Sequence, residues 1–385
     1  MSKYVIDNTT LTSIGNAIRE KEGSSGAIKV SDFATRISAI EGGGGSGEGG
    51  LVLTGDISNA FNIRQTTTYI TELKENLERM YEILFTEEMK TKDITNFSYT
   101  FAGYSTGEDY PQITTIPFDI NIQEGIYANA AYAFINQAYL TALPKINGGI
   151  SNLQYTFWGI HRAANFEEVF ANVELSPSLA SLNYTFCNCS SMRSLPKDFF
   201  KDCTKIKAFG SAFSGCYVLD EINNLGVYDG TLTSNVFSDT FNNCSRLKSL
   251  TFTTNDDGTP IKADWKSQTI NLTGYIGYCY SGSPTNVTGY NSGITNDTKV
   301  TNAATYEALK DNPDWWTTSV SYSRYNHDSA VETINSLPDT SHYGTNTIKF
   351  KSTMGIATDG GGMENLTEEE IAVAAAKGWT VSLTS

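Results

Sequence analysis

The chain has few residues of the kinds that enzymes use for catalysis. Its 385 residues include three histidines, and Asp, Glu, Lys and Arg together make up 18%. His161, His327 and His342 stand far apart, with neither triad nor metal-ligand spacing. Neither Gly-x-Ser-x-Gly nor a phosphate-binding glycine loop is present. We therefore expect no enzymatic activity, no catalytic residue, no metal and no cofactor.

Basic residues are also scarce. The 27 Lys and Arg against 42 Asp and Glu give a net charge of −15. Phosphate contacts need clustered basic side chains, and the densest local group, Lys201, Lys205 and Lys207, is better explained as a solvated face. The composition argues against nucleic-acid binding.

Long apolar runs are missing as well. No stretch approaches the roughly 20 residues of a membrane span, so we expect no membrane insertion. The first residues lack a basic segment followed by an apolar run, which is the pattern of a secretory signal. We expect a chain that is made and kept in a bacterial cytoplasm, or that leaves it inside something else, such as a virion released by lysis. Free thiols fit this history, because cytosolic folding keeps them reduced.

What the chain does have is a repeated phrase, Phe-x-x-Cys-x-x-aliphatic-x-x-apolar. Its four copies begin at Phe186, Phe200, Phe213 and Phe241, and a looser copy begins at Phe134. The recurring aromatic anchors Phe101, Phe134, Phe157, Phe186, Phe213 and Phe241 stand 33, 23, 29, 27 and 28 residues apart. Phe200 marks a shorter sub-repeat. Most gaps fall in or beside the leucine-rich-repeat range of roughly 20–29 residues.

One repeat is too small to bury its own apolar face, so stacked repeats are expected to share columns of phenylalanine, aliphatic residues and cysteine. We expect the segments with phenylalanine to form a helical turn or short helix. Residues 191–195 and 245–250 would be strand-like steps. The predicted core comprises Phe134, Phe157, Phe186, Cys189, Phe213, Cys216, Phe241 and Cys244.

The cysteines have two interpretations. A buried column of thiols is favoured, because four of the six occupy the same repeat position. The alternative is a metal site or disulfide at Cys187-x-Cys189, although this spacing matches no strong zinc pattern.

Across residues 96–255 the phrase resembles the BspA-like leucine-rich repeats of bacterial surface proteins and phage structural proteins. The resemblance implies an α/β repeat fold, a leucine-rich-repeat solenoid. We expect this solenoid to carry a small N-terminal helical anchor and a short β-rich and helical C-terminal cap.

Residues 1–41 are expected to be a small helical module, in which residues 7–41 form two short amphipathic helices that are either folded onto the chain itself or used for docking. Residues 42–50 are a glycine-rich linker that would uncouple them from the rest. The segments 14–21 and 28–33 resemble an N-terminal module of phage tail, fibre and other structural proteins, which implies attachment to other virion proteins. The candidate docking residues are Leu11, Ile14, Ile18, Phe33, Ile37 and Ile40.

Residues 51–95 contain a two-heptad apolar seam. It predicts either a helix that caps the repeats or an oligomerising helix, and the analogy with phage fibres favours a homotrimer. The seam residues are Ile70, Leu73, Leu77, Met80 and Leu84.

Residues 256–385 are expected to form loops, short strands and a cap. Trp315, Trp316, Tyr322 and Tyr325 are an aromatic cluster, expected in a core or on a sugar-binding platform. Thr367 and Glu370 fit a capping box, and Gly378 would end that helix before a strand at 379–383. The segments 366–381 and 329–335 resemble the closing segment of phage-encoded leucine-rich-repeat proteins.

Together these features favour a non-enzymatic phage structural protein located in the virion, a tail or head fibre that adheres to a host-surface glycan or protein. Two alternatives stay open: a bacterial cell-surface leucine-rich-repeat adhesin and a phage polysaccharide depolymerase.

Overall fold

The computed structural model describes residues 52–61, 89–103, 113–244, 247–273, 299–300, 319–320, 327–343, 346–351 and 366–384. The chain divides into two compact units, Met1–Glu174 (unit 1) and Leu175–Ser385 (unit 2). The predicted docking residues, the heptad seam and the cluster around Trp315 lie outside the described residues. Within the described residues, no helix is both long and apolar enough to cross a membrane.

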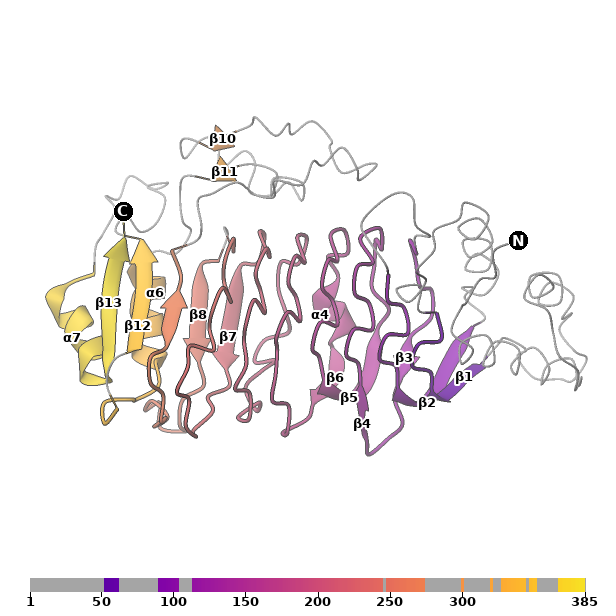
Figure 1. The fold of residues 1–385 in the computed structure, drawn as a ribbon, viewed down its shortest axis with the longest axis horizontal. Helices are drawn as coiled ribbons and strands as arrows, with labels where there is room; N and C mark the ends of the chain where they lie inside the picture. Colours follow the sequence, from indigo (N-terminus) through magenta and orange to yellow (C-terminus); the bar gives the residue numbers. More distant parts are fainter. Residues whose placement is uncertain are drawn as a thin grey trace, which may run out of the picture. The chain divides into compact units, whose positions relative to one another are not determined.

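Unit 1 is built on a parallel sheet with the strand order β1-β2-β4-β5-β3, to which β6 is added beside β5 (Figure 1). A short helix, α4 (Phe166–Val169), precedes β6. The strands are β1 (Val52–Asp56), β2 (Lys90–Asn96), β3 (Ile120–Asn121), β4 (Tyr127–Asn129), β5 (Ile146–Asn152) and β6 (Asn172–Leu175). Strand β1 thus pairs with β2 from inside the segment 51–95, which was predicted to be helical around its heptad seam.

A turn at 123–126 separates β3 from β4, and Gly125 takes a φ of +76° there. Strand β5 pairs with both, with β3 at Ile146 and with β4 at Ile150. The parallel pairing continues past the strand ends into the turns: the Phe97 N–H donates to Asn129 O at 3.0 Å and the Phe101 N–H to Ala133 O at 2.8 Å. We call one strand together with the turn that follows it a coil. Each of these coils is held in register with the next along both the strand and the turn.

A column of phenylalanine rings fills the interior of unit 1. Phe61, Phe101, Phe134 and Phe157 stack with centroid distances of 5.6, 5.3 and 5.6 Å and interplanar angles of 16° or less. Phe170, just after α4, closes the column with its ring at 87° to Phe157. Phe101, Phe134 and Phe157 are fully buried. Register and ring stacking support each other, because the strand pairing aligns equivalent residues of successive coils.

The described residues of unit 2 form parallel sheets with strand orders β7-β8, β10-β11 and β13-β12-β9. They also form the helices α6 (His327–Ser336) and α7 (Glu368–Ala376). The strands are β7 (Glu221–Leu225), β8 (Ser249–Phe252), β9 (Thr269–Asn271), β10 (Lys299–Val300), β11 (Ser319–Val320), β12 (Asn346–Lys351) and β13 (Trp379–Thr384).

The core of unit 2 repeats the ring column and adds a column of thiols. Phe186, Phe213 and Phe241 stack at 5.5 and 5.8 Å. The Cys216 Sγ donates to Phe186 O at 3.0 Å, and the Cys244 Sγ donates to Phe213 O at 3.1 Å. Each thiol therefore bonds to a carbonyl of the preceding coil. Phe200 does not join the column: its ring lies at 75° to Phe213.

Two local expectations were wrong. The segments with phenylalanine form consecutive turns instead of a helical turn, because they contain left-handed residues such as Tyr132 and Asn136. Residues 191–195 form no strand, whereas β8 overlaps the end of the second predicted step at Ser249 and Leu250 and continues to Phe252.

Helix α7 forms where its capping residues indicate. The Thr367 Oγ1 accepts from the Glu370 N–H at 3.2 Å, and the Glu370 carboxylate accepts from the Thr367 N–H at 2.7 Å. Gly378 follows with a φ of +84° and starts the turn into β13. The helix packs on β13, the outer strand of its sheet (Figure 1). It thereby protects a strand edge that would otherwise invite pairing with another chain.

Gly378→Ala is expected to cost at least about 2 kcal/mol more than Gly258→Ala. Both glycines have a φ near +80°, so both substitutions strain the backbone. Only at Gly378 would the new Cβ also meet backbone, the Thr340 carbonyl at 2.8 Å; at Gly258 nothing lies within 4 Å. Urea unfolding of both full-length variants measures the difference. Equal losses would show that the Thr340 backbone yields freely.

Candidate functional site

A short turn recurs at the end of the strands and determines what the surface presents. Its first residue has a side-chain oxygen that accepts the backbone N–H two residues later: Asn96 from Ser98 at 3.0 Å, Asn129 from Ala131 at 3.1 Å and Asn152 from Gln154 at 3.0 Å. Such Asx turns let the chain leave a strand without unpaired N–H groups. These asparagines lie opposite one another in the strand register.

The fourth residue of each turn is left-handed, and in four turns it is tyrosine. Tyr99, Tyr132, Tyr155 and Tyr184 have φ values of 57°, 61°, 57° and 55°. Elsewhere the residue two positions before a phenylalanine of the column is also left-handed, at Asn59, Ser211 and Asp239. For a residue with a bulky side chain this conformation is unfavourable by about 1–2 kcal/mol. Tyrosine is thus not the residue that the backbone prefers.

The same turns contain a second left-handed position, two residues after the phenylalanine. It is occupied only by asparagine or glycine, at Asn136, Gly159, Asn188, Gly215 and Asn243. At this position the chain uses residues that tolerate the left-handed backbone, whereas at the first position it uses tyrosine despite the strain, which indicates that the tyrosines are present for their side chains.

In unit 1 three of these tyrosines stack into one array, which we call the tyrosine ladder: Tyr99, Tyr132 and Tyr155. Their centroids are 4.5 and 4.7 Å apart, with interplanar angles of 5° and 6°. Backbone bonds hold the coils in place, since the Tyr99 N–H donates to Ala131 O and the Tyr132 N–H to Gln154 O, each at 3.0 Å. Each stacked pair contributes about 0.5–1.5 kcal/mol, which offsets part of the backbone strain.

The ladder presents ring edges to the solvent. The three side chains are half-buried, and the rings face one another, which leaves edges and phenol groups as the outward surface. Trp158 adjoins Tyr155 at 5.6 Å with its plane turned by 60°, so it does not continue the stack. The segments that carry these side chains, 96–103, 129–138 and 152–160, contain no charged residue. These segments are aromatic, amide-rich and uncharged, and the Asp56 carboxylate on β1 accepts from the Asn96 amide at 3.2 Å.

A second polar row lies on β3, β5 and β6. The Asn147 Nδ2 donates to Asn121 Oδ1 at 2.9 Å, and the Asn172 Nδ2 donates to Asn147 Oδ1 at 2.8 Å. The amides bond along the row, so their main role is to hold adjacent coils in register.

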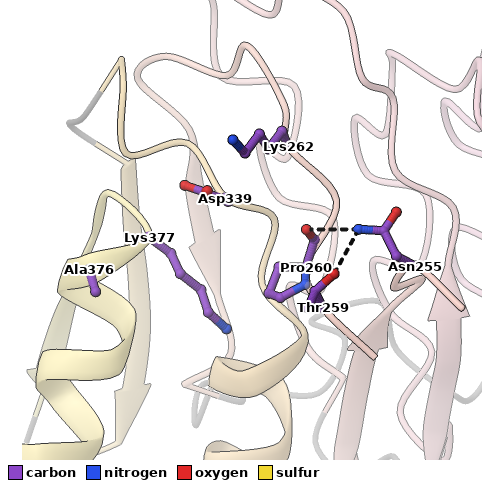
Figure 2. Close-up of a pocket in the computed structure, with 7 residues that line it drawn as sticks. All are labelled: Asn255, Thr259, Pro260, Lys262, Asp339, Ala376 and Lys377. Atoms are coloured by element: carbon purple, nitrogen blue, oxygen red, sulfur yellow. Dashed lines mark hydrogen bonds between the residues drawn. The ribbon is translucent and has the colours of Figure 1, made fainter. Parts of the chain in front are cut away.

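Unit 2 contains a pocket of about 490 Å³ (Figure 2). It is lined by Asn255, Thr259, Pro260, Lys262, Asp339, Ala376 and Lys377. The Lys377 Nζ donates to Ile334 O at 2.8 Å and to Asn335 O at 2.6 Å, so it caps the C-terminus of α6. Burial lowers the pKa of Lys377 to about 8, although nearby Asp339 acts in the opposite direction.

The remaining polar groups of the pocket also bond locally. The Asn255 amide donates to Thr259 Oγ1 at 3.0 Å and to Pro260 O at 3.3 Å (Figure 2). Burial acts to raise the pKa of Asp339, but hydrogen bonds from Ser341 outweigh it and the pKa is lowered. None of these seven residues is a serine, cysteine or histidine, so the pocket contains no nucleophile–base pair of the usual kind.

The three histidines occupy unrelated places. His161 is buried, and burial lowers its pKa to about 4, with a further contribution from Arg162. The His327 Nε2 lies 3.0 Å from the Glu370 carboxylate at the cap of α7. The His342 Nε2 lies 3.0 Å from the Asp264 carboxylate. Among the described residues, no group of three or more His, Cys, Asp or Glu is placed to hold a metal.

All eight predicted core residues are buried, each with at most 3% of its surface exposed. The five cysteines of the described residues, Cys187, Cys189, Cys203, Cys216 and Cys244, are buried and free. The tyrosine ladder was not predicted from the sequence. The Tyr-x-Phe prefix at 99, 132, 155 and 184 contains the signal, but it was interpreted only as part of the repeat and not as a surface feature.

Comparison of the chain with protein-family models, with curated proteins and with solved structures finds no match in any of the three. The function of the chain is therefore inferred from its residues and their geometry.

Proposed function

We propose that this chain is a non-enzymatic structural protein of a bacteriophage virion, a tail or head fibre that adheres to the host cell through a repeat surface. The observation that carries the adhesive part is the tyrosine ladder, where one side-chain type recurs in register on adjacent coils. Each contact to such a surface is weak, but many contacts along the coils and on several copies of the chain add up through avidity.

The fold that belongs to this proposal is a leucine-rich-repeat solenoid of the BspA-like kind. In support, successive coils in unit 1 pair in parallel, and each unit has a column of stacked phenylalanines. In repeat proteins of this type the core serves stability, and binding uses side chains that vary on the surface.

Attachment to the particle is proposed through residues 1–41, with residues 42–50 as a tether. Support comes from the amphipathic pattern of this segment and its resemblance to phage docking modules. The partners would be other virion proteins at the N-terminus and a host-surface molecule at the repeats. A homotrimer would multiply the adhesive surface, in analogy with phage fibres. No cofactor enters the proposal.

Deletion of residues 1–41 is expected to lower the number of copies per phage particle at least tenfold while residues 51–385 stay folded. The readout is quantitative mass spectrometry of gradient-purified particles, with circular dichroism of the purified variant. The matched control replaces residues 42–50 by nine residues of Gly and Ser, which keeps the tether flexible and should keep incorporation. Normal incorporation of the deletion variant would refute docking through this segment.

Antibody labelling of the same particles locates the chain on the head or the tail. Complete absence from particles would overturn the virion proposal in favour of a bacterial surface adhesin. Release of reducing sugar from host capsule would overturn the non-enzymatic part.

A further inference from the structure

The three tyrosines of the ladder have a strained left-handed backbone, and the fold could form with less strained residues at these positions. Asn59, Ser211 and Asp239 hold the same left-handed position, two residues before a phenylalanine of the column, without an aromatic ring, so the position does not need tyrosine. Stacking of the rings compensates part of the strain, but phenylalanine would stack equally well. Tyrosine at all three positions therefore gives the half-buried ladder a row of hydroxyl groups that phenylalanine would lack.

The ladder is also organised before any partner arrives. Tyr132 is stacked on both sides, at 4.5 Å by Tyr99 and at 4.7 Å by Tyr155, so its ring has little rotational freedom left to lose. Binding surfaces with rigid aromatic side chains lose little entropy on binding, and tyrosine adds a hydroxyl that both donates and accepts.

The charge of the surface restricts the partner. The three segments of the ladder contain no Asp, Glu, Lys or Arg, and the Asp56 carboxylate accepts from the Asn96 amide in one of them, so an anionic polymer would find no complementary charge in these segments. The net charge of −15 further disfavours anionic polymers. Uncharged partners rich in hydroxyl groups fit best, because phenol and amide groups match their donors and acceptors.

We infer that the tyrosine ladder, with Trp158 at its end, binds an uncharged polysaccharide across adjacent coils. The inference rests on the proposed adhesive function and adds the chemical class of the receptor and the side chains that contact it. Because equivalent side chains recur on three coils, a repeating polymer can use all of them at once, whereas a single sugar can use one.

The test is native affinity electrophoresis of the full-length chain in gels that contain dextran, mannan or galactan, with alginate as the anionic comparison. At least one neutral polysaccharide is expected to retard the wild-type chain, and alginate is not. Tyr132→Asn should weaken the retardation at least tenfold, because it removes the central ring. Asparagine accepts the left-handed backbone, so the variant is expected to fold.

Two further variants sharpen the experiment. Tyr132→Phe keeps the stack and removes only the hydroxyl, and a loss of threefold or more assigns a contact to that group. It also keeps the test valid if Tyr132→Asn does not fold by circular dichroism. Tyr343→Asn makes the same exchange at a tyrosine of unit 2 that is 39% exposed, and it should bind like wild type.

Three results would overturn the inference: no retardation by any of the neutral polysaccharides, preference for alginate, or wild-type retardation of both Tyr132 variants. Its failure is distinguishable from failure of the proposed function. If the chain is found in particles and binds host cells equally with and without Tyr132→Asn, the ladder is not the adhesive surface but the virion role stands. If retardation depends on Tyr132 but the chain is absent from particles, the ladder inference stands and the virion role falls.

Discussion

Phe134→Ala is expected to lower the free energy of unfolding of unit 1 by about 3–5 kcal/mol, the range for removing a large ring from a packed core. Phe134 is fully buried between Phe101 at 5.3 Å and Phe157 at 5.6 Å. The substitution removes apolar burial and both stacking contacts at once. The cavity cannot collapse easily, because the Phe134 N–H donates to Thr156 O at 2.9 Å and holds the spacing between coils.

Chemical denaturation followed by circular dichroism measures this loss. Tyr127→Ala is the matched control: it truncates an aromatic side chain in the same coil that is 37% exposed, and it should cost less than about 1 kcal/mol. Phe134→Leu should fall between the two, since it refills part of the cavity. If Phe134→Ala and Tyr127→Ala cost the same, the phenylalanine column does not support unit 1.

The core could be predicted from the sequence, because apolar residues that recur at the same position of every repeat indicate which side chains are buried. Only positions that face the interior must stay apolar in every copy, so Phe186, Phe213 and Phe241 mark one column and Cys216 and Cys244 another. The spacing between copies then places equivalent residues on successive coils.

The conformation of the turns could not be predicted in the same way. A left-handed residue is usually signalled by glycine or asparagine, and that signal exists at Asn136 and Gly159. Tyr99, Tyr132 and Tyr155 have bulky side chains that disfavour a left-handed backbone. The sequence therefore predicted a helical turn there instead of left-handed residues. The neighbouring repeat imposes the conformation, through backbone hydrogen bonds to residues 22 to 32 positions further along the chain.

Surface features cannot be predicted without knowing how the strands pair. Tyr99 and Tyr155 are separated by 56 residues, and only the pairing of Asn96, Asn129 and Asn152 aligns them. The pocket at Lys377 is similar, since it combines residues 255–262 with Asp339 and the end of α7. No pattern in the sequence joins these segments.

The buried thiols lead to the second large effect, a loss of stability of unit 2 at alkaline pH. Burial raises the pKa of Cys187 and of Cys203 to about 12, and raises the pKa of Cys216 and of Cys244 further. In the unfolded chain these thiols have a pKa near the ordinary thiol value of 9.0. Above that pH the unfolded state loses protons that the folded state keeps, so ionisation favours unfolding.

The stabilisation is therefore complete below pH 9 and is lost as the pH rises toward the folded values, which begin near 12. At one pH unit above the unfolded pKa, each such thiol lowers the free energy of unfolding by about 1.4 kcal/mol, and four together by about 5 kcal/mol. Lys377 opposes this trend, because its lowered pKa of about 8 makes it neutral in the folded state first.

Comparison with Cys216→Ser isolates one thiol, because the contribution of Lys377 is the same in both chains. At pH 7 the substitution should cost about 1–2 kcal/mol, since a more polar hydroxyl enters an apolar column, although it can still donate to Phe186 O. Between pH 8 and pH 10 the variant should lose about 1.4 kcal/mol less than wild type, because the hydroxyl does not titrate. Guanidinium unfolding under a phosphine reductant at each pH gives both values. Parallel pH profiles would mean that the Cys216 thiol ionises as easily in the folded chain as in the unfolded one, which its complete burial does not allow.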